Sequence, residues 1–354
     1  MGKLTGLCGR GWRFMRQYGA VRLWRKVKER RDRNRAEQNY ESWLQDCLPD
    51  EAETRRQRAV VFPFAPLISI LVPAYETPEP FLRQMMDSVL AQSYGKLELC
   101  IADGSPSEKV RRVAEEYACR DSRVRYQKLE QNLGISGNTN AALAMARGEY
   151  TGLLDHDDLL LPGALYEIVR ALNDGEPADA VYTDEDKLDS ERNVHFQPHF
   201  KPDFNPEYLR SNNYICHFFL VKRETALETG GFRQEFDGAQ DHDFILRCTE
   251  KARKVVHVPR VLYSWRCHAA STADNPESKL YAYEAGKRAV AAHLERCGTP
   301  GNVRNTENYG FFRVQYPGSS EFFIKSFEKF DGQTGINVVY YDKACINSVT
   351  IFGK

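Results

Sequence analysis

The stretch LLDHDDLL, residues 153–160, places three carboxylates directly after an apolar run with the character of a buried strand. Carboxylates that lie close together repel one another, and a hard cation with a preference for oxygen ligands relieves that repulsion. A strand that ends in such a cluster therefore predicts a divalent-cation site suited to a diphosphate. The alternative interpretation is an acidic surface turn that precedes a helix starting near Pro162.

Apolar runs and helical patterns alternate on the N-terminal side of this stretch. The alternation predicts parallel βαβ crossovers and a doubly wound, mostly parallel α/β sheet. Ligands of such sheets bind at the carboxyl ends of strands, where both Asp103 and residues 155–158 fall. The candidate strands cover residues 67–73, 97–101, 124–127 and 150–154, and the candidate helices cover residues 77–90, 108–117 and 136–146.

The second half of the chain has a different character. Residues 195–214 are rich in Pro, Phe, Tyr and Asn and are predicted to form a long structured loop. Arg occurs often up to Arg313 and not afterwards, so residues 318–354 are predicted to be an atypical C-terminal tail. The remaining candidate strands cover residues 181–184, 216–221, 255–258, 261–265, 338–341 and 349–352, and helices are predicted after Asp243 and over residues 278–296.

Charge is balanced over the whole chain but not along it. The 354 residues contain 49 Lys plus Arg and 49 Asp plus Glu, which argues against a general nucleic-acid binder. Residues 1–35 carry twelve basic side chains, interleaved with Trp and Phe, against Glu29 and Asp32. A basic helix of this kind is typical of contact with an anionic membrane surface, and a solvated helix on the domain is the alternative. We expect a basic helical appendage over residues 1–62, an α/β domain over 63–317 and the tail over 318–354.

Nine dispersed cysteines without a Cys-x-x-Cys pair predict reduced thiols in a cytoplasmic protein. No apolar stretch approaches the ~20 residues of a membrane span. Together with the basic N-terminal residues, this predicts a protein at the inner face of the cytoplasmic membrane.

Residues that follow the first two candidate strands have the chemistry of a nucleotide pocket. Pro73 and Tyr75 follow the first strand, and Asp103 ends the second. The Tyr75 ring could pack on a base, and Asp103 could accept a hydrogen bond from that base. The alternative for Asp103-Gly104-Ser105 is a simple turn.

Two further groups of residues are candidates for a cation site and for a general base. Asp155 and Asp157, with Asp158 beside them, are the candidate cation ligands. His268 follows a strand end and is a candidate further ligand, although a lone histidine is more often structural. Asp241, in QDHD at residues 240–243, lies at a predicted helix start. It is either an N-cap or the general base that takes the proton of an attacking hydroxyl.

Taken together, these motifs strongly resemble the family 2 inverting nucleotide-sugar glycosyltransferases of the GT-A fold. The motifs are ISILVPAY (68–75), DGS (103–105), NLG (132–134), GEY (148–150), LLDHDD (153–158) and QDHDFILR (240–247). Within that family the chain is most similar to bacterial enzymes of O-antigen, rhamnan-type and capsule synthesis. The segments that carry this narrower resemblance are TDEDK (183–187), residues 199–217 and YSWRCHAAST (263–272).

The resemblance implies a role for each matching residue. Asp103 is implied to bind the base, Asp155 and Asp157 to form the D-x-D metal motif, Asp241 to be catalytic and His268 to ligate the metal. The chain departs from the family pattern at Ala102, where the family often has an Asp, and at Gln240, where it often has a Glu. It also departs at residues 137–139, where the family often has Ala-Arg-Asn.

The implied activity is a metal-assisted inverting glycosyltransferase that uses Mg²⁺ or Mn²⁺. It would move rhamnose or another hexose from a nucleoside-diphosphate sugar to a hydroxyl of a lipid-linked or surface-polysaccharide acceptor. One alternative is a metal-dependent nucleotidyltransferase or phosphoesterase. Another is a catalytically inactive, sugar-nucleotide-binding remnant of a longer two-domain transferase, which the unusual tail would fit.

Overall fold

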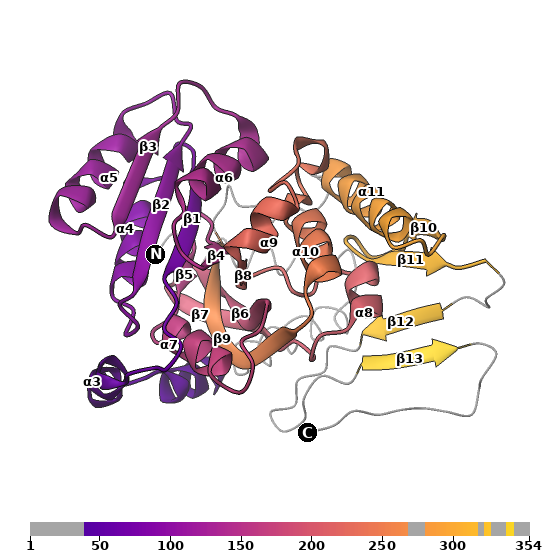
Figure 1. The fold of residues 1–354 in the computed structure, drawn as a ribbon, viewed down its shortest axis with the longest axis horizontal. Coiled ribbons are helices and arrows are strands. Elements are labelled where there is room, and N and C mark those ends of the chain that lie inside the picture. Colours follow the sequence, from indigo (N-terminus) through magenta and orange to yellow (C-terminus); the bar gives the residue numbers. More distant parts are fainter. Residues whose placement is uncertain (1–38, 268–279, 318–321, 327–337, 343–354) are drawn as a thin grey trace, which may run out of the picture.

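The computed structural model describes residues 39–267 and 280–317, together with the backbone of residues 322–326 and 338–342. Helices flank a central sheet on both sides, and a separate hairpin lies near the C-terminus (Figure 1). None of the described helices is long and apolar enough to cross a membrane.

The central sheet contains nine strands. They are β1 Ile68–Ala74, β2 Leu97–Asp103, β3 Val124–Lys128, β4 Tyr150–Leu153, β5 Leu159–Leu160, β6 Ala180–Asp189, β7 Val194–His199, β8 Phe219–Lys222 and β9 Val255–Cys267. Their order is β3-β2-β1-β4-β8-β6-β9-β5, with β7 beside β6. The strands from β3 to β4 are parallel, β8 runs antiparallel to both β4 and β6, and β6 and β9 are parallel. The predicted α/β class and mostly parallel sheet are confirmed, and β8 is the reversed strand that joins the two parallel parts.

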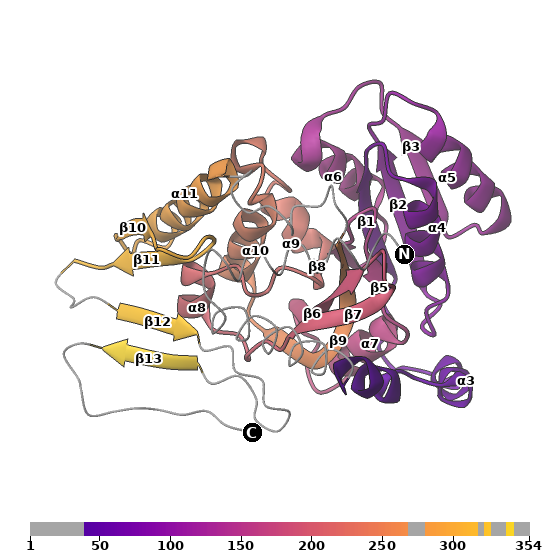
Figure 2. The same ribbon diagram turned by 180° about the vertical axis from the view of Figure 1, so that it is seen from behind.

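Alternate side chains of the strands pack into two hydrophobic cores, one on each face of the sheet. Ile68 and Ile70 of β1 face the core that the helices α4, α5 and α7 cover, whereas Leu71 faces the core of α6, α10 and α11 (Figure 2). The helices are α4 Glu79–Leu90, α5 Lys109–Arg120, α6 Gly134–Met145, α7 Ala164–Leu172, α8 Pro206–Ser211, α9 Arg223–Glu228, η1 Gln234–Phe236, α10 Gln240–Lys251 and α11 Leu280–Arg296. Their apolar residues recur at helical spacing, as with Leu82, Met85, Met86 and Val89 of α4.

The second half of the sheet is more regular than the sequence predicted. The two strands predicted at 255–258 and 261–265 form one strand, β9, which bulges against β6 between Val258 and Val261. The bulge accommodates Pro259, which has no amide hydrogen for a regular ladder. The loop predicted at 195–214 contains most of β7 and all of α8.

Residues near both ends of the described chain pack on this core or extend from it. Tyr40 and Leu44, on the helical residues 39–47, are buried, and the Tyr40 hydroxyl donates a hydrogen bond to Asp186 Oδ2 at 2.8 Å. The other peripheral elements are α3 Glu51–Ala59, β10 Asn302–Asn305, β11 Phe312–Gln315, β12 Phe322–Ser326 and β13 Val338–Asp342. The strand predicted at 338–341 is thus found, paired antiparallel with β12. The basic residues 1–35 and the strand predicted at 349–352 lie outside the described residues.

Candidate active site

The acidic stretch forms a turn between β4 and β5 that gathers possible metal ligands. Ligand atoms of Asp155, Asp158 and His217 all lie within 4.8 Å of one another. Burial raises the pKa of Asp155; His217 opposes this shift, whereas the charges of Asp157 and Asp241 add to it. Repelling carboxylates beside an imidazole are a donor set that fits a divalent cation.

Asp158 anchors this turn. Its buried carboxylate accepts hydrogen bonds from the Tyr263 hydroxyl and, at 2.7 Å, from the Arg266 amide. Arg266 Nε also donates to the Asp157 carbonyl oxygen at 2.5 Å. Burial raises the pKa of Asp158 well above its usual value, and the charges of Asp155 and Asp157 add to the shift. Since both oxygens of Asp158 have protein partners, Asp155 is the better candidate of this group for direct metal contact, and the role of Asp157 as a ligand stays a prediction.

His217 is a site residue that the sequence did not reveal as one. Its ring stacks on Tyr263, with 4.8 Å between ring centroids and 13° between planes. Its amide donates to Glu185 Oε2 at 3.1 Å, and Lys201 Nζ donates to the carbonyl oxygens of His217 and Ile215. The imidazole is therefore fixed at the carboxylates through both its ring and its backbone. His217 is the last residue of the segment 199–217, which carries part of the family resemblance.

The Glu185–Lys201 ion pair behind His217 is almost completely buried. Lys201 has no exposed side-chain surface, and Glu185 exposes 10%. Burial works against ionisation of Glu185, but the charge of Lys201 and a hydrogen bond from His199 lower its pKa to about 2. The TDEDK stretch thus supplies a buried support for the site rather than a further set of metal ligands.

Asp241 and Asp243 occupy the first turn of α10 but have different surroundings. Asp241 Oδ2 accepts a hydrogen bond from Asn213 Nδ2 at 2.8 Å and lies 3.7 Å from the Cys216 thiol. The N-cap residue of α10 is Ala239, which makes no side-chain cap. The N-cap interpretation of Asp241 is therefore wrong. Its carboxylate contacts Cys216 instead, the neighbour of His217, whose imidazole lies within 4.8 Å of a ligand atom of Asp155.

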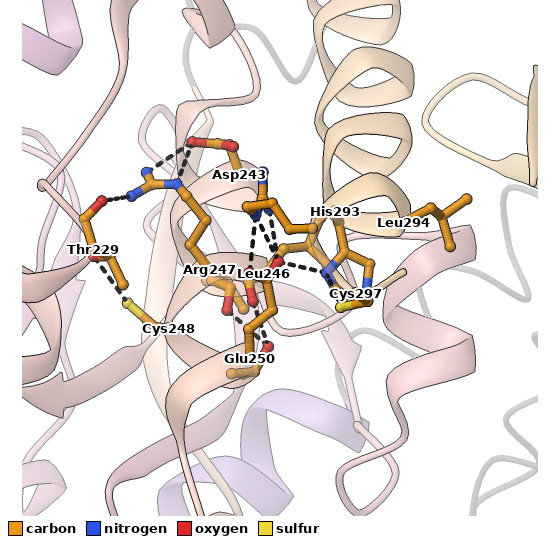
Figure 3. A network of polar contacts seen from close by, with 12 residues as sticks. Thr229, Asp243, Leu246, Arg247, Cys248, Glu250, His293, Leu294 and Cys297 are labelled. Carbon is orange, nitrogen blue, oxygen red and sulfur yellow. Dashed lines mark hydrogen bonds and ion pairs between the residues drawn. The ribbon is translucent and has the colours of Figure 1, made fainter. Parts of the chain in front are cut away.

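Asp243, in contrast, is completely buried in an ion-pair network. It accepts a hydrogen bond from Arg233. It also accepts from Arg247, whose Nε and terminal nitrogen lie 2.9 and 2.7 Å from Oδ2 (Figure 3). Arg247 also donates to the carbonyl oxygens of Thr229 and Gly231, both at 2.6 Å. Asp243 therefore fixes the segment before α10, and its role is structural.

A second group of possible metal ligands lies further along the same helix. Glu250, His293 and Cys297 bring a carboxylate, an imidazole and a thiol within 4.8 Å (Figure 3). However, His293 Nδ1 lies 2.6 Å from Glu250 and its Nε2 accepts from Arg210 Nε at 3.1 Å, while Arg296 pairs with the same carboxylate. Two guanidinium groups at this position make it an ion-pair network that joins α10 to α11.

The residues predicted to form a nucleotide pocket lie at the carboxyl ends of β1 and β2. Pro73 is buried within β1, and Tyr75 just beyond it exposes 45% of its surface. The buried Asp103 carboxylate accepts hydrogen bonds from the Tyr126 hydroxyl at 2.8 Å and from Lys128 Nζ at 3.1 Å. Tyr126 and Lys128 come from β3 and were not predicted as site residues, because only the parallel pairing of β2 with β3 brings them to Asp103.

The turn after Asp103 packs against the loop that precedes α6. A Cβ atom at Gly104 would lie 2.7 Å from Asn138 Nδ2 on α6, so a larger residue here would require the Asn138 side chain to shift. Asn132 Oδ1 accepts from Asn138 Nδ2 and from the Gly134 amide, both at 3.0 Å. The DGS and NLG motifs are therefore in contact with each other, next to Asp103.

The structure thus places Asp241 close to the turn that holds Asp155 and Asp157. Tyr75 follows the neighbouring strand β1, and Asp103 ends β2, two strands from β4. His268 lies outside the described residues, so its assignment as a metal ligand stays a prediction.

Comparison with known proteins shows which family and which fold this chain is similar to. The family model described as glycosyl transferase family 2 matches residues 69–229. An uncharacterized protein of Sinorhizobium fredii, y4gI, is 45% identical over 237 residues, which are 65% of this chain and 26% of that protein. The O-antigen biosynthesis protein RfbC of Myxococcus xanthus is 33% identical over 280 residues, which are 79% of this chain and 22% of that protein. The chain thus spans about a quarter of the length of these curated relatives.

Among solved structures, the fold is similar to that of S. aureus TarS 1-349 in complex with UDP-GlcNAc. The TM-score is 0.51 at 19% sequence identity, over 64% of this chain and 66% of that one. This similarity concerns the fold.

Proposed function

Because the chain carries a glycosyl transferase family 2 domain with a GT-A fold, we propose that it transfers a sugar from a nucleoside-diphosphate sugar to an acceptor hydroxyl, with inversion at the anomeric carbon. The observation that supports this most directly is the pair of adjacent residues Cys216 and His217, of which Cys216 contacts Asp241 on α10 and His217 lies within 4.8 Å of Asp155. Asp155 is suited to a metal-bound diphosphate, and Asp241 is suited to the reacting hydroxyl of the acceptor.

The donor fits along the carboxyl edge of the parallel strands. Tyr75 and Asp103 would contact the base, while Asp155 and Asp157 would face the diphosphate. Two strand spacings separate β2 from β4, so these groups are about 10 Å apart, a span that a nucleoside diphosphate bridges. Asp155 can also accept a hydrogen bond from the ribose, which lies between base and diphosphate.

A divalent cation, Mg²⁺ or Mn²⁺, would offset the negative charge that develops on the leaving diphosphate. Asp155 and Asp157 would hold it, with His268 as the further ligand that the family pattern implies and His217 as the imidazole that the geometry offers. The fit rests on the donor set itself, because carboxylates that repel one another bind a cation readily.

Asp241 would act as the general base. The acceptor hydroxyl gives its proton to Asp241 while its oxygen bonds to the anomeric carbon, and the bond from that carbon to the diphosphate oxygen breaks on the opposite face. Asn213, which donates to Asp241 Oδ2, would leave the other oxygen free to receive the proton. One displacement of this kind inverts the anomeric centre.

The acceptor would be a lipid-linked or growing surface polysaccharide, and the sugar rhamnose or another hexose. The printed name of the RfbC relative, an O-antigen biosynthesis protein, supports this class of acceptor. The basic residues 1–35 would bring the protein to the anionic inner face of the cytoplasmic membrane, where such acceptors are assembled.

The test is release of nucleoside diphosphate from a panel of UDP-, GDP- and dTDP-sugars by the purified chain, with Mn²⁺, with Mg²⁺ and with EDTA. We expect release from one donor type that requires the cation. Formation of a nucleotide sugar from a sugar 1-phosphate and a nucleoside triphosphate would instead identify a nucleotidyltransferase. Binding of nucleotide sugars without any release, with or without acceptor, would identify an inactive remnant.

A further inference from the structure

Two exposed tyrosines and a half-buried one form an aromatic patch at the start of α11 and in the segment between β10 and β11. Tyr281 and Tyr309 expose 57% and 50% of their surface, and Leu280 beside them exposes 55%. Tyr283 and Tyr309 stack with 4.8 Å between ring centroids and 12° between planes. None of the three hydroxyls has a hydrogen-bond partner among the described residues. Flat apolar rings that gather at the surface in this way mark a binding site more often than a packing defect.

The patch lies at the end of α11 that is next to the proposed catalytic helix. A Cβ atom at Gly238, three residues before Asp241, would lie 2.7 Å from the Tyr281 ring. The far ends of the two helices are joined as well, through Glu250 and His293. The helices therefore run in the same direction, and the N-terminus of α11 points to the same side as Asp241.

A second connection links the stacked pair, Tyr283 and Tyr309, to the proposed general base, Asp241. Gly310, next to Tyr309, accepts a hydrogen bond from Asn212 Nδ2 through its carbonyl oxygen at 3.1 Å. The neighbouring residue, Asn213, is the one that donates to Asp241. The patch and the proposed base are thus fixed to the same short segment.

We propose that Tyr281, Tyr283 and Tyr309 form a platform that binds sugar rings of the acceptor glycan; this inference rests on the proposed function and extends it. A pyranose ring has an apolar face of C–H groups that packs on an aromatic ring, while its hydroxyls need polar partners at the edge. Exposed polar groups flank the rings here: Glu284, which accepts from Asn305 Nδ2 at 2.5 Å, and Asn308 next to Tyr309. The combination of large apolar rings with a polar edge is typical of ligand sites that bind an amphipathic molecule.

The position also suits an acceptor rather than a donor. Base and diphosphate are assigned to the ends of β1, β2 and β4, whereas the platform is linked to α10, where the acceptor hydroxyl would meet Asp241. A growing polysaccharide needs contacts beyond its reacting sugar, and rings one or more sugars away from Asp241 would supply them.

The test uses the full chain and an array of oligosaccharides that contain hexose, 6-deoxyhexose and hexosamine units. We expect Tyr281→Ala and Tyr309→Ala to weaken binding to the best array ligand by about tenfold each, the worth of one stacked ring. Tyr281→Phe keeps the ring and should bind like the original chain. Trp43→Ala, which removes an exposed aromatic residue from the helical residues 39–47, should also leave binding unchanged.

The same proteins are titrated with UDP and GDP in the presence of Mn²⁺. Retained nucleotide affinity together with lost glycan binding in the alanine variants supports the platform. Equal glycan binding by all variants, or no glycan bound by the original chain, overturns it even where nucleotide binding is intact. A change in sedimentation coefficient without a change in glycan binding would assign the patch to contact with a second copy and would also overturn it. Absence of any nucleotide binding would instead count against the proposed function.

Discussion

At the scale of single residues, the first turn of α10 contains two carboxylates that we expect to have different roles, Asp241 in the reaction and Asp243 in folding. Asp241 and Asp243 are both acidic, yet one contacts the amide of Asn213 and the other is enclosed by two arginines. Successive helical positions rotate by about 100°, so residues two apart point to nearly opposite sides. The two carboxylates therefore give different, testable outcomes.

We predict that Asp241→Asn lowers the rate of sugar transfer by ~10²–10⁴-fold, the usual contribution of a positioned base. The affinity for nucleoside diphosphate should change little, because the side chain is assigned to the acceptor. Transfer is measured with radiolabelled donor, and affinity by calorimetry. Gln240→Glu is the matched control one residue away; it introduces the carboxylate that the family often has there and should keep transfer within a few-fold. Full transfer activity in Asp241→Asn would show that another group is the base.

Asp243→Asn should act on stability instead. The amide cannot replace a charge that pairs with Arg233 and the buried Arg247, and breaking such a buried pair costs about 3–5 kcal/mol. Urea denaturation followed by circular dichroism gives the free energy of unfolding. A loss below about 1 kcal/mol would mean that the network is not needed for folding.

For the cation site, we predict that Asp157→Asn selectively weakens the metal-dependent part of nucleotide binding. The amide removes one negative charge but little volume, so affinity in EDTA should stay the same. The measurement is titration with UDP and GDP, with and without Mn²⁺. Asp174→Asn, at an exposed carboxylate outside the site, is the control. If the original chain binds nucleotide equally well in EDTA, the carboxylate cluster has no cation role in donor binding.

At the scale of secondary-structure elements, α10 and α11 are joined by an ion pair that depends on pH. Burial opposes ionisation of Glu250, but His293 and Arg296 lower its pKa from the ordinary 4.5 to about 2. A carboxyl group whose pKa is lowered by folding stabilises the folded state above pH 4.5. That contribution is lost as the pH falls through 2.

The prediction is that Glu250→Gln makes the free energy of unfolding less dependent on pH between 4.5 and 2. Urea midpoints measured at several pH values in this window test it. Glu295→Gln, at an exposed position of α11, is the control and should keep the original slope. Identical slopes in the original chain and in Glu250→Gln would contradict the assignment.

Elements with a strong local pattern were predicted closely from the sequence. The first four strands and the helices between them were predicted to within a few residues, because apolar runs and helical spacing mark them directly. The fusion of two predicted strands into β9 was missed, since Pro259 and Arg260 interrupt the apolar pattern and only the pairing with β6 continues the strand. The reversal at β8 was also missed, because no local pattern encodes strand direction.

The site residues were likewise predictable where a local sequence pattern marks them, and not where contacts between distant segments bring them together. Asp103, Asp155, Asp157 and Asp241 stand at strand or helix ends and could be chosen from the sequence. His217 could not, because its proximity to Asp155 arises from contacts with Lys201, Glu185 and Tyr263 that are far apart along the chain. Tyr126 and Lys128 were missed for the same reason.

At the scale of the whole molecule, we predict that the basic N-terminal residues bring the protein to an anionic membrane surface. The chain should sediment with vesicles that contain anionic lipids at low salt and be released at high salt. Each basic residue near such a surface contributes about 1 kcal/mol, and residues 1–35 carry ten net positive charges. A shortened chain should start at residue 39, because Tyr40 and Leu44 are part of a buried cluster.

That shortened chain should stay in the supernatant, and its melting temperature should match that of the full chain. Equal sedimentation of both chains at low salt would show that the membrane contact lies elsewhere. Neutral vesicles serve as the control, since they lack the charge on which the predicted binding depends.

The two acidic side chains of the first α10 turn also affect how genetic data on this protein would be interpreted. A saturation mutagenesis library selected for polysaccharide production would show depletion at both codons. Without a parallel measurement of cellular abundance, the two positions would be indistinguishable, although variants at Asp241 should accumulate normally and those at Asp243 should be degraded. Variant maps of this region therefore need two phenotypes, and the ratio of production to abundance at each codon would identify the residue that takes part in the reaction.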